Sequence, residues 1–178
     1  MYLVYNLPTY NSICRCPLAM TDGAAKTLLS CDQSDIEISN AYQRLISRNP
    51  EKFWTSGQWM TEKRGGSDVR NATETEAIPN TEVDNSGKSF FLFGTKWFSS
   101  AADSDMALVL AKRETRIDLF YVRTRDPNDN KKLNGIRFDG LKNKLGTRQL
   151  PTAELILDGA KATLLSKEGH GISRISDM

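Results

Sequence analysis

The first fifty residues place their hydrophobic positions at helical spacing. Between Ser12 and Leu29 apolar residues recur along one stripe, which predicts an amphipathic helix. A second helix is predicted after Ser34, because Ser34 and Glu37 have the spacing of a capping box. Asn49-Pro50 then stops this helix.

From Phe53 onward the pattern changes to short runs of branched and aromatic residues between turn residues. Residues 84–88, Asp-Asn-Ser-Gly-Lys, predict a hairpin turn between segments 73–83 and 89–93, because Asn and Gly tolerate the positive φ of such turns. Further strands are predicted at 106–112, 119–123, 135–138 and 153–157, and a new helix from Ile172. The predicted fold class is α+β: a helical segment, then a mostly antiparallel β-sandwich or barrel, ending at the start of a helix.

Composition and charge narrow the function without naming a partner. Across 178 residues, 24 Lys and Arg face 22 Asp and Glu, a net charge of +2. This is far from the strongly basic balance of most nucleic-acid-binding domains, so we do not expect a nucleic-acid partner. The longest apolar runs, such as Met106 to Ala111, are much shorter than the roughly 20 residues of a membrane-spanning helix, so no membrane span is predicted.

The three cysteines, Cys14, Cys16 and Cys31, are an odd number gathered near one end of the chain. This favours a reduced, intracellular protein, in the cytoplasm or the mitochondrion, over a disulfide scaffold. Cys14 and Cys16 lack a second ligand pair and His170 is distant in sequence, so no metal site is predicted. Residues 1–8 lack the pattern of a secretory signal.

Residues 58–68 lead from an extended apolar segment into small hydrogen-bonding residues. The adjacent glycines Gly65 and Gly66 would let the backbone approach a flat polar ring, and Thr61 and Ser67 each add a hydroxyl. An ordinary β-turn explains such a loop equally well. Taken alone, the segment is a weak indication of a ligand cradle.

A second candidate segment, residues 94–101, sets the indole of Trp97 near the hydroxyl of Ser99. These groups could stack on and hydrogen-bond to an aromatic cofactor, although a Trp in a strand is more often part of the core. Strand alternation points Phe98 the other way, and we expect its side chain in the core.

Other titratable residues do not form a recognisable catalytic set. Glu62, Asp68 and Asp139 are interpreted as turn caps or surface charges, since no spacing pairs them. His170 has no nucleophile motif beside it and is interpreted as a loop residue. Arg148 has no assigned contact and is open to a surface or inter-subunit ion pair.

The order and separation of segments 61–68 and 94–99 resemble the middle domain of the acyl-CoA dehydrogenases, which carries Thr-Glu before Gly-Ser-Asp and then a Gly-x-Lys segment with Trp. The resemblance extends through residues 106–111, 141–148, 152–155 and 164–171, and covers about residues 13 to 178. Lys63 stands where most of the family carries Pro, and residues 54–62 are similar to the AidB-like branch.

The resemblance implies an FAD site. The backbone at Met60 and the side chain of Thr61 would bind the pyrimidine edge of the isoalloxazine, within the loop that includes Gly66. Ser67 would contact the cofactor or the bound acyl-CoA. Trp97 would pack on the flavin, and Ser99 would bond near N5.

The resemblance also implies an oxidoreductase of fatty acid metabolism that dehydrogenates the α,β bond of an acyl-CoA thioester. It divides the chain into a remnant of the N-terminal helical domain (1–50), the middle β-domain (51–165) and the start of the C-terminal helical domain (166–178). In the family a Glu of the C-terminal domain removes the α-proton, so no catalytic residue is expected here and the chain alone is expected to be inactive. The full-length family implies a homo-oligomer.

Two alternatives remain open at this point. One is a non-catalytic module that binds flavin or acyl chains without turnover. The other is nucleic-acid association, which the AidB-like branch suggests, although Lys131, Lys132, Lys142, Lys144 and Arg148 form only a small basic group.

Overall fold

The computed structural model describes residues 12–66, 68–81 and 87–176. The described part of the chain begins with two helices, α2 (Ser12–Leu29) and α3 (Ile36–Leu45), close to the predicted positions. Asp35 caps α3, since its carboxylate accepts the backbone N–H groups of Glu37 and Ile38. The predicted capping box is therefore wrong in its capping residue, because the Ser34 hydroxyl instead donates to Asp32.

Nine strands follow, interrupted by the short helix α4 (Val69–Ala72) and ending before α5 (Gly171–Ser176). Their bounds are β1 (Ser56–Trp59), β2 (Glu76–Pro79), β3 (Ser89–Ser100), β4 (Met106–Arg113), β5 (Arg116–Arg123), β6 (Arg125–Asp126), β7 (Asp129–Leu133), β8 (Ile136–Leu141) and β9 (Thr152–Leu164). The predicted strands near 106, 119, 135 and 153 are confirmed, and β9 is much longer than predicted because its alternation continues past Leu157.

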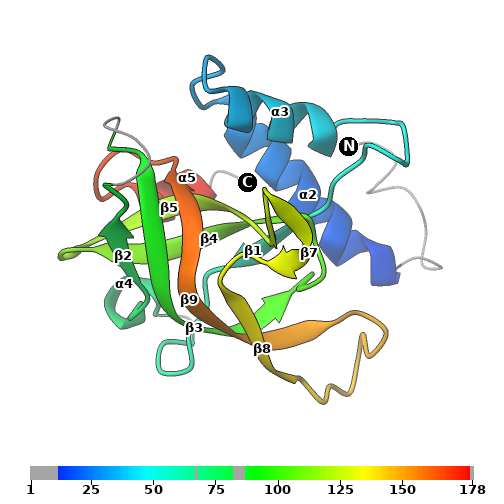
Figure 1. Ribbon diagram of the computed structural model, residues 1–178. Coiled ribbons are helices and arrows are strands. Elements are labelled where there is room, and N and C mark those ends of the chain that lie inside the picture. Colours follow the sequence, from blue (N-terminus) through cyan, green and yellow to red (C-terminus); the bar gives the residue numbers. More distant parts are fainter. Residues whose placement is uncertain (1–11, 67, 82–86, 177–178) are drawn as a thin grey trace.

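The main sheet closes on itself as a barrel (Figure 1), in which β4, β2, β3, β9 and β5 follow one another and β5 pairs back onto β4. β1 lies parallel to β4 and β8 lies antiparallel to β9, both outside this ring. β2 and β3 pair antiparallel as the hairpin prediction requires, although residues 84–86 of its turn lie outside the described residues. The α+β class with a mostly antiparallel barrel is confirmed.

Two apolar clusters hold the layers together. One fills the barrel and includes Phe90, Leu92 and Leu155. The other lies between the barrel wall and the helices α2, α3 and α5, and includes Leu28 and Ile38. Helices α2 and α3 stack on one side of the barrel in Figure 1.

Strand β4 contributes to both clusters, which explains its unbroken apolar sequence. Leu108 and Leu110 face the helices, while Ala107, Val109 and Ala111 face the barrel interior, and all five are fully buried. A strand covered on both faces has no polar alternation. Within the described residues, no helix is both long and apolar enough to cross a membrane.

Gly135 provides a test of how closely the chain at the start of β8 packs against β9. Its φ is +58°, and an added Cβ would lie 2.7 Å from the backbone of Gly159 and Ala160. We expect Gly135→Ala to lower the free energy of unfolding by about 2 kcal/mol or more, measured by urea denaturation. Gly140→Ala, with open space and no positive φ, is the matched control. Equal effects of the two substitutions would contradict this account.

Candidate flavin-facing site and its buried ion pair

The barrel brings the two candidate segments side by side. The backbone N–H of Trp97 donates to the carbonyl of Thr61 at 2.8 Å. The indole N–H of Trp59 donates to the carbonyl of Ser100 at 3.2 Å. The end of β3 is therefore fixed alongside the residues that follow β1.

The loop after β1 takes its shape from Glu62 and α4. The backbone N–H groups of Gly65 and Gly66 donate to the Glu62 carbonyl at 3.1 and 3.3 Å. A Cβ on Gly65 would lie 2.7 Å from the Cβ of Ala72, so this glycine is needed for packing against α4. Gly66 is exposed with a φ of +49° and open space around its Cα.

The other predicted residues of this loop are placed as follows. Met60 is half-buried and packs its side chain on the helix-facing cluster, which leaves only its backbone for the opposite side. Thr61 is half-buried at the junction with β3. Ser67, predicted to contact cofactor or substrate, lies outside the described residues.

A β-bulge changes the orientation of side chains at the end of β3. Lys96 pairs with Leu155 and Ser99 with Ala153, so β3 carries one extra residue there. Phe98 has a φ of +56° and is 53% exposed, so the prediction that it belongs to the core is wrong. Alternation alone could not reveal this, because the bulge breaks the period of two.

The same bulge buries Ser99. Its side chain is 1% exposed, and its Oγ has no hydrogen-bond partner among the described residues. Ser100, the next residue, is half-buried and lines a pocket of about 310 Å³ beside Met20 of α2 and Leu150. Of these two serines, Ser100 is therefore the one that borders open space.

Trp97 is half-buried under two lysines. The Lys142 ammonium lies over its ring and also pairs with Glu154 at 2.5 Å, while the Lys63 ammonium lies 4.9 Å from the ring centroid. These are cation–π contacts, which hold the indole in place. Lys63, the departure from the family pattern, is thus placed against the Trp predicted to pack on the flavin.

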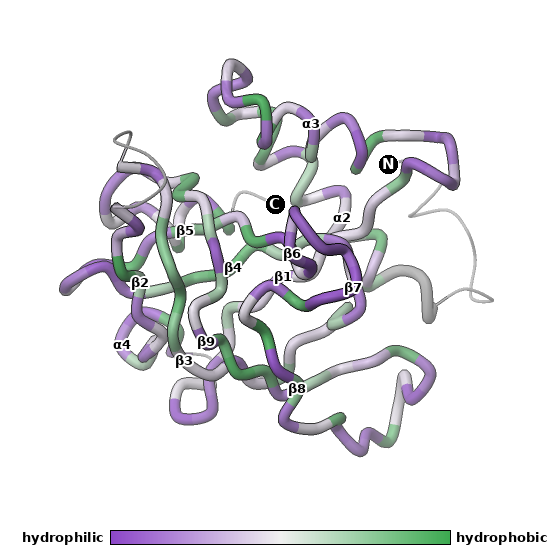
Figure 2. The backbone as a smooth tube through the Cα atoms, in the orientation of Figure 1, coloured by the Kyte–Doolittle hydropathy of each residue, from purple (hydrophilic) through white to green (hydrophobic). Residues whose placement is uncertain are grey.

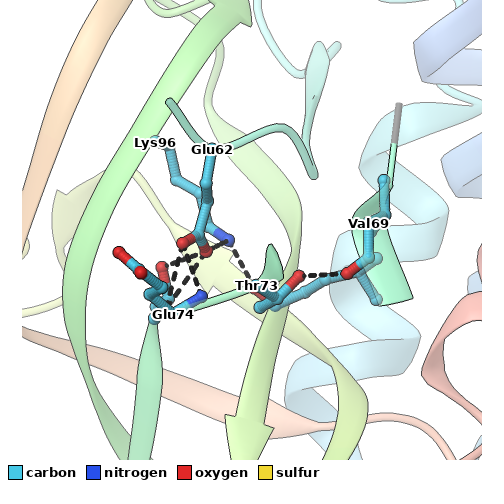
Figure 3. Close-up of polar contacts among 7 residues, drawn as sticks. Glu62, Val69, Thr73, Glu74 and Lys96 are labelled. Atoms are coloured by element: carbon cyan, nitrogen blue, oxygen red, sulfur yellow. Dashed lines mark hydrogen bonds and ion pairs between the residues drawn. The ribbon is translucent and has the colours of Figure 1, made fainter. Parts of the chain in front are cut away.

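Glu62 and Lys96 form a buried ion pair beneath the loop (Figure 3). Their charged atoms are 2.6 Å apart, and the side chains are 4% and 0% exposed. The carboxylate also accepts the backbone N–H of Glu74 at 2.6 Å and the hydroxyl of Thr75 at 2.7 Å. Lys96 donates in addition to the carbonyl of Leu110 at 2.6 Å. Glu62 is therefore not the surface charge or turn cap that we predicted.

Sequence spacing does not reveal this pair, because Glu62 and Lys96 are 34 residues apart and meet only through the pairing of strands. Burial lowers the pKa of Lys96, and the Glu62 carboxylate opposes that shift. For Glu62, burial acts to raise the pKa, but the Lys96 charge and the hydrogen bonds from Lys96, Thr75 and Glu74 outweigh it, and the pKa is lowered.

The remaining candidates make no contact that suggests catalysis. Asp68 ends the same loop and caps α4 as predicted, accepting from the Asn71 N–H, and Asp139 is exposed and lines a small pocket with Lys63 and Trp97. His170 precedes α5 in an exposed loop, and Arg148 donates to the carbonyl of Lys144 at 2.6 Å. Cys16 and Cys31 are free thiols. Within the described ranges, no three His, Cys, Asp or Glu side chains gather as a metal cluster.

Removing one partner of the buried pair should be costly. Glu62→Gln leaves the Lys96 ammonium buried without a counter-charge, and we expect it to lower the free energy of unfolding by about 3–5 kcal/mol in urea titrations. Glu74→Gln is the matched control, because Glu74 pairs with Arg64 on the surface, and it should cost under ~1 kcal/mol. The double variant Glu62→Gln/Lys96→Met should be more stable than Glu62→Gln alone; the reverse order would refute the assignment.

The pair should also appear in the pH dependence of stability. A carboxylate with a lowered folded pKa stabilises the protein above its unfolded pKa of about 4.3, and this contribution is lost as the pH falls through the folded pKa. The stability difference between wild type and Glu62→Gln should therefore shrink below about pH 4.3. Urea titrations from pH 7 to pH 3 measure it, and a difference that does not change with pH would contradict the pKa shift.

Comparison with known proteins gives the family. A family model described as acyl-CoA dehydrogenase, middle domain, matches residues 57–160. "Acyl-CoA dehydrogenase family member 11" of Caenorhabditis elegans is 48% identical over 92% of this chain, and "Putative acyl-CoA dehydrogenase AidB" of Escherichia coli is 34% identical over 92%. The chain spans 27% and 30% of these two relatives.

The solved structure of the Caenorhabditis elegans protein ACDH-11 in complex with C11-CoA superposes with a TM-score of 0.82 at 47% identity, covering 91% of this chain and 28% of that one. The family expected from the sequence is confirmed, and AidB is among the relatives. The match over more than half of the 178 residues, together with these relatives, shows that this chain belongs to the acyl-CoA dehydrogenase family.

Proposed function

We propose that this chain supplies the middle-domain part of the flavin and acyl-CoA site of an FAD-dependent acyl-CoA dehydrogenase. The observation that carries the proposal is the junction of Thr61 with Trp97, where the loop after β1 and the bulged end of β3 meet through a 2.8 Å backbone hydrogen bond. In this family the same two segments carry the recognisable motifs.

The side chains at this junction fit a planar heteroaromatic ring. Phe98 offers an exposed aromatic side chain, and Thr61 and Ser100 are half-buried residues with hydroxyl groups. The buried, unpartnered Oγ of Ser99 adds a polar atom without a partner among the described residues. A protein tunes a flavin through such hydrogen bonds and by holding its ring in place.

The resemblance implies Trp97 and Ser99 beside the flavin, together with Gly66 and Ser67, and these contacts stay predictions. The bulge turns Phe98 outward, and Ser100 is less buried than Ser99. We therefore propose Thr61, Phe98, Ser100 and the Met60 backbone as the contacts. Trp97, held by Lys63 and Lys142, lies beside Phe98, with the ring centroids 6.2 Å apart.

A bound FAD supplies the hydride-accepting chemistry of α,β-dehydrogenation. The role of this chain is then to bind and orient the cofactor and the acyl-CoA. The structure of ACDH-11 was solved in complex with C11-CoA, and we extend an acyl-CoA ligand to this chain as part of the proposal. The base that removes the α-proton belongs, by the resemblance, to the C-terminal helical domain of the family.

The proposal includes the organisation of the whole protein. Residues 1–50 would belong to the N-terminal helical domain, 51–165 to the middle domain and 166–178 to the start of the C-terminal domain. Because the chain spans less than a third of its curated relatives, the activity and oligomeric state of the whole protein are part of this proposal.

Flavin binding tests the proposal. We expect the chain to perturb the visible band of added FAD, and Thr61→Ala and Phe98→Ala to weaken FAD binding roughly tenfold each, measured by quenching of flavin fluorescence. Thr115→Ala, in the exposed β4–β5 turn, is the matched control and should bind FAD as wild type does. Measuring FAD binding by Trp97→Ala tests the assignment implied by the resemblance, in which Trp97 itself packs on the flavin.

Two outcomes would count against the proposal. A folded chain that leaves FAD unperturbed would show that these segments do not form a flavin site in this chain. Bleaching of the flavin band by added acyl-CoA would show that the chain contains its own base. We expect the band to remain, which on its own would also fit a non-catalytic flavin-binding module.

A further inference from the structure

A second polar pocket lies between α3 and the β6–β7 ribbon, away from the proposed flavin site. It encloses about 360 Å³ and is lined by Arg44 at the end of α3, Trp54 before β1, Asp105 before β4, Arg123 at the end of β5, and Arg125 and Asn130 of the ribbon. Figure 1 shows α3 and β7 on the same side of the barrel, and Figure 2 shows the ribbon as strongly hydrophilic.

Three arginines in this pocket have no carboxylate partner. Among the described residues, no acidic side chain lies within ion-pair distance of Arg44, Arg123 or Arg125, whereas some arginines elsewhere are paired, such as Arg64 with Glu74 and Arg113 with Asp118. The Nε atoms of Arg44 and Arg123 are buried and have no hydrogen-bond partner in the part of the chain that the structure describes. Such groups are costly to bury unless an acceptor reaches them.

Trp54 organises two of these guanidinium groups. Arg44 lies over the indole at 4.7 Å from the ring centroid, and Arg123 lies over it at 5.2 Å. A stacked guanidinium uses its face for the aromatic contact and keeps its N–H donors free at the edge. Arg123 and Arg125 reach Asn130 only through long contacts of 3.4 Å. The guanidinium N–H donors are therefore held in position without short hydrogen bonds to acceptors in the pocket.

The charges favour a dianion. Asp105 is the one acidic residue in the described lining, and its carboxylate already accepts the backbone N–H of Thr55 at 2.8 Å. Three guanidinium groups against one carboxylate leave two positive charges, which match a phosphate group better than a monoanionic carboxylate.

The neighbouring pocket limits where in the arginine-lined pocket an anion could bind. Arg123 also lines a hollow of about 190 Å³ that contains Glu37 and Tyr121. The Tyr121 hydroxyl is buried without a hydrogen-bond partner among the described residues. Burial and the nearby Asp35 raise the pKa of Glu37, and its carboxyl group makes this side unfavourable for an anion. An anionic group would sit on the Arg125 side, with Tyr121 beyond it.

From these observations we propose that the pocket formed by Arg44, Trp54, Arg123 and Arg125 binds the phosphate group of a small phosphorylated molecule. Guanidinium forks match the geometry of phosphate oxygens and give charge-assisted hydrogen bonds. The site is separate from the Thr61–Trp97 junction and does not depend on flavin binding.

Calorimetric titration of the full chain with inorganic phosphate, at constant ionic strength in chloride, tests the proposal. We expect saturable binding that weakens roughly tenfold or more in Arg44→Gln and in Arg125→Gln, since each loses a hydrogen bond to a charged group. Arg137→Gln, on the exposed face of β8, is the matched control and should bind as wild type does. Arg125→Gln decides the result if Arg44→Gln fails to fold, because Arg125 is exposed and does not stack on Trp54.

Three results would overturn it. One is the absence of any heat from phosphate beyond that of chloride alone, and another is equal phosphate binding by the Arg125→Gln and Arg137→Gln variants. Acetate binding as tightly as phosphate would overturn the chemical class, because it would show a general carboxylate site. Retention of FAD binding in Arg125→Gln would separate this site from the flavin site.

Discussion

The ion pair between Glu62 and Lys96 ties together more of this structure than any other polar contact described. Its carboxylate accepts from the backbone of Glu74 and from Thr75 at the entry to β2, while Lys96 of β3 reaches the carbonyl of Leu110 on β4. Three barrel strands and the loop after β1 therefore meet at one buried charge pair. A buried ion pair is stable only when the other donors and acceptors of both groups have hydrogen-bond partners, and here nearly all of them do.

The ion pair also fixes the geometry of the proposed flavin site. Glu62 follows Thr61 directly, and Lys96 precedes Trp97, so anchoring the pair sets the register in which the Trp97 N–H meets the Thr61 carbonyl. The bulge that begins after Lys96 then turns Phe98 outward and buries Ser99. The accessible surface at this edge is thus a consequence of a buried electrostatic contact, and the rigid barrel behind it keeps the contact in place.

The two polar regions of the molecule illustrate different uses of charge. Beneath the loop after β1, the opposite charges of Glu62 and Lys96 neutralise one another and stabilise the fold. Between α3 and the β6–β7 ribbon, the indole of Trp54 holds the like charges of Arg44 and Arg123 together, and among the described residues no carboxylate lies within ion-pair distance of either. The first arrangement is complete in itself, whereas the second leaves donors available to a ligand.

The sequence determined the larger elements and the family, but not β1, α4 or the β6–β7 ribbon. The helical stripes of α2 and α3, the β-rich middle and the order of the Thr61 and Trp97 segments are local patterns, and they were read correctly because side-chain periodicity and motif order do not depend on distant contacts. Only the tertiary structure decided the pairing of Glu62 with Lys96, the exposure of Phe98 and the meeting of Arg44 with Arg123. These depend on barrel closure and on one extra residue in β3, and neither leaves a periodic signal, because each arises from contacts between strands far apart in the chain.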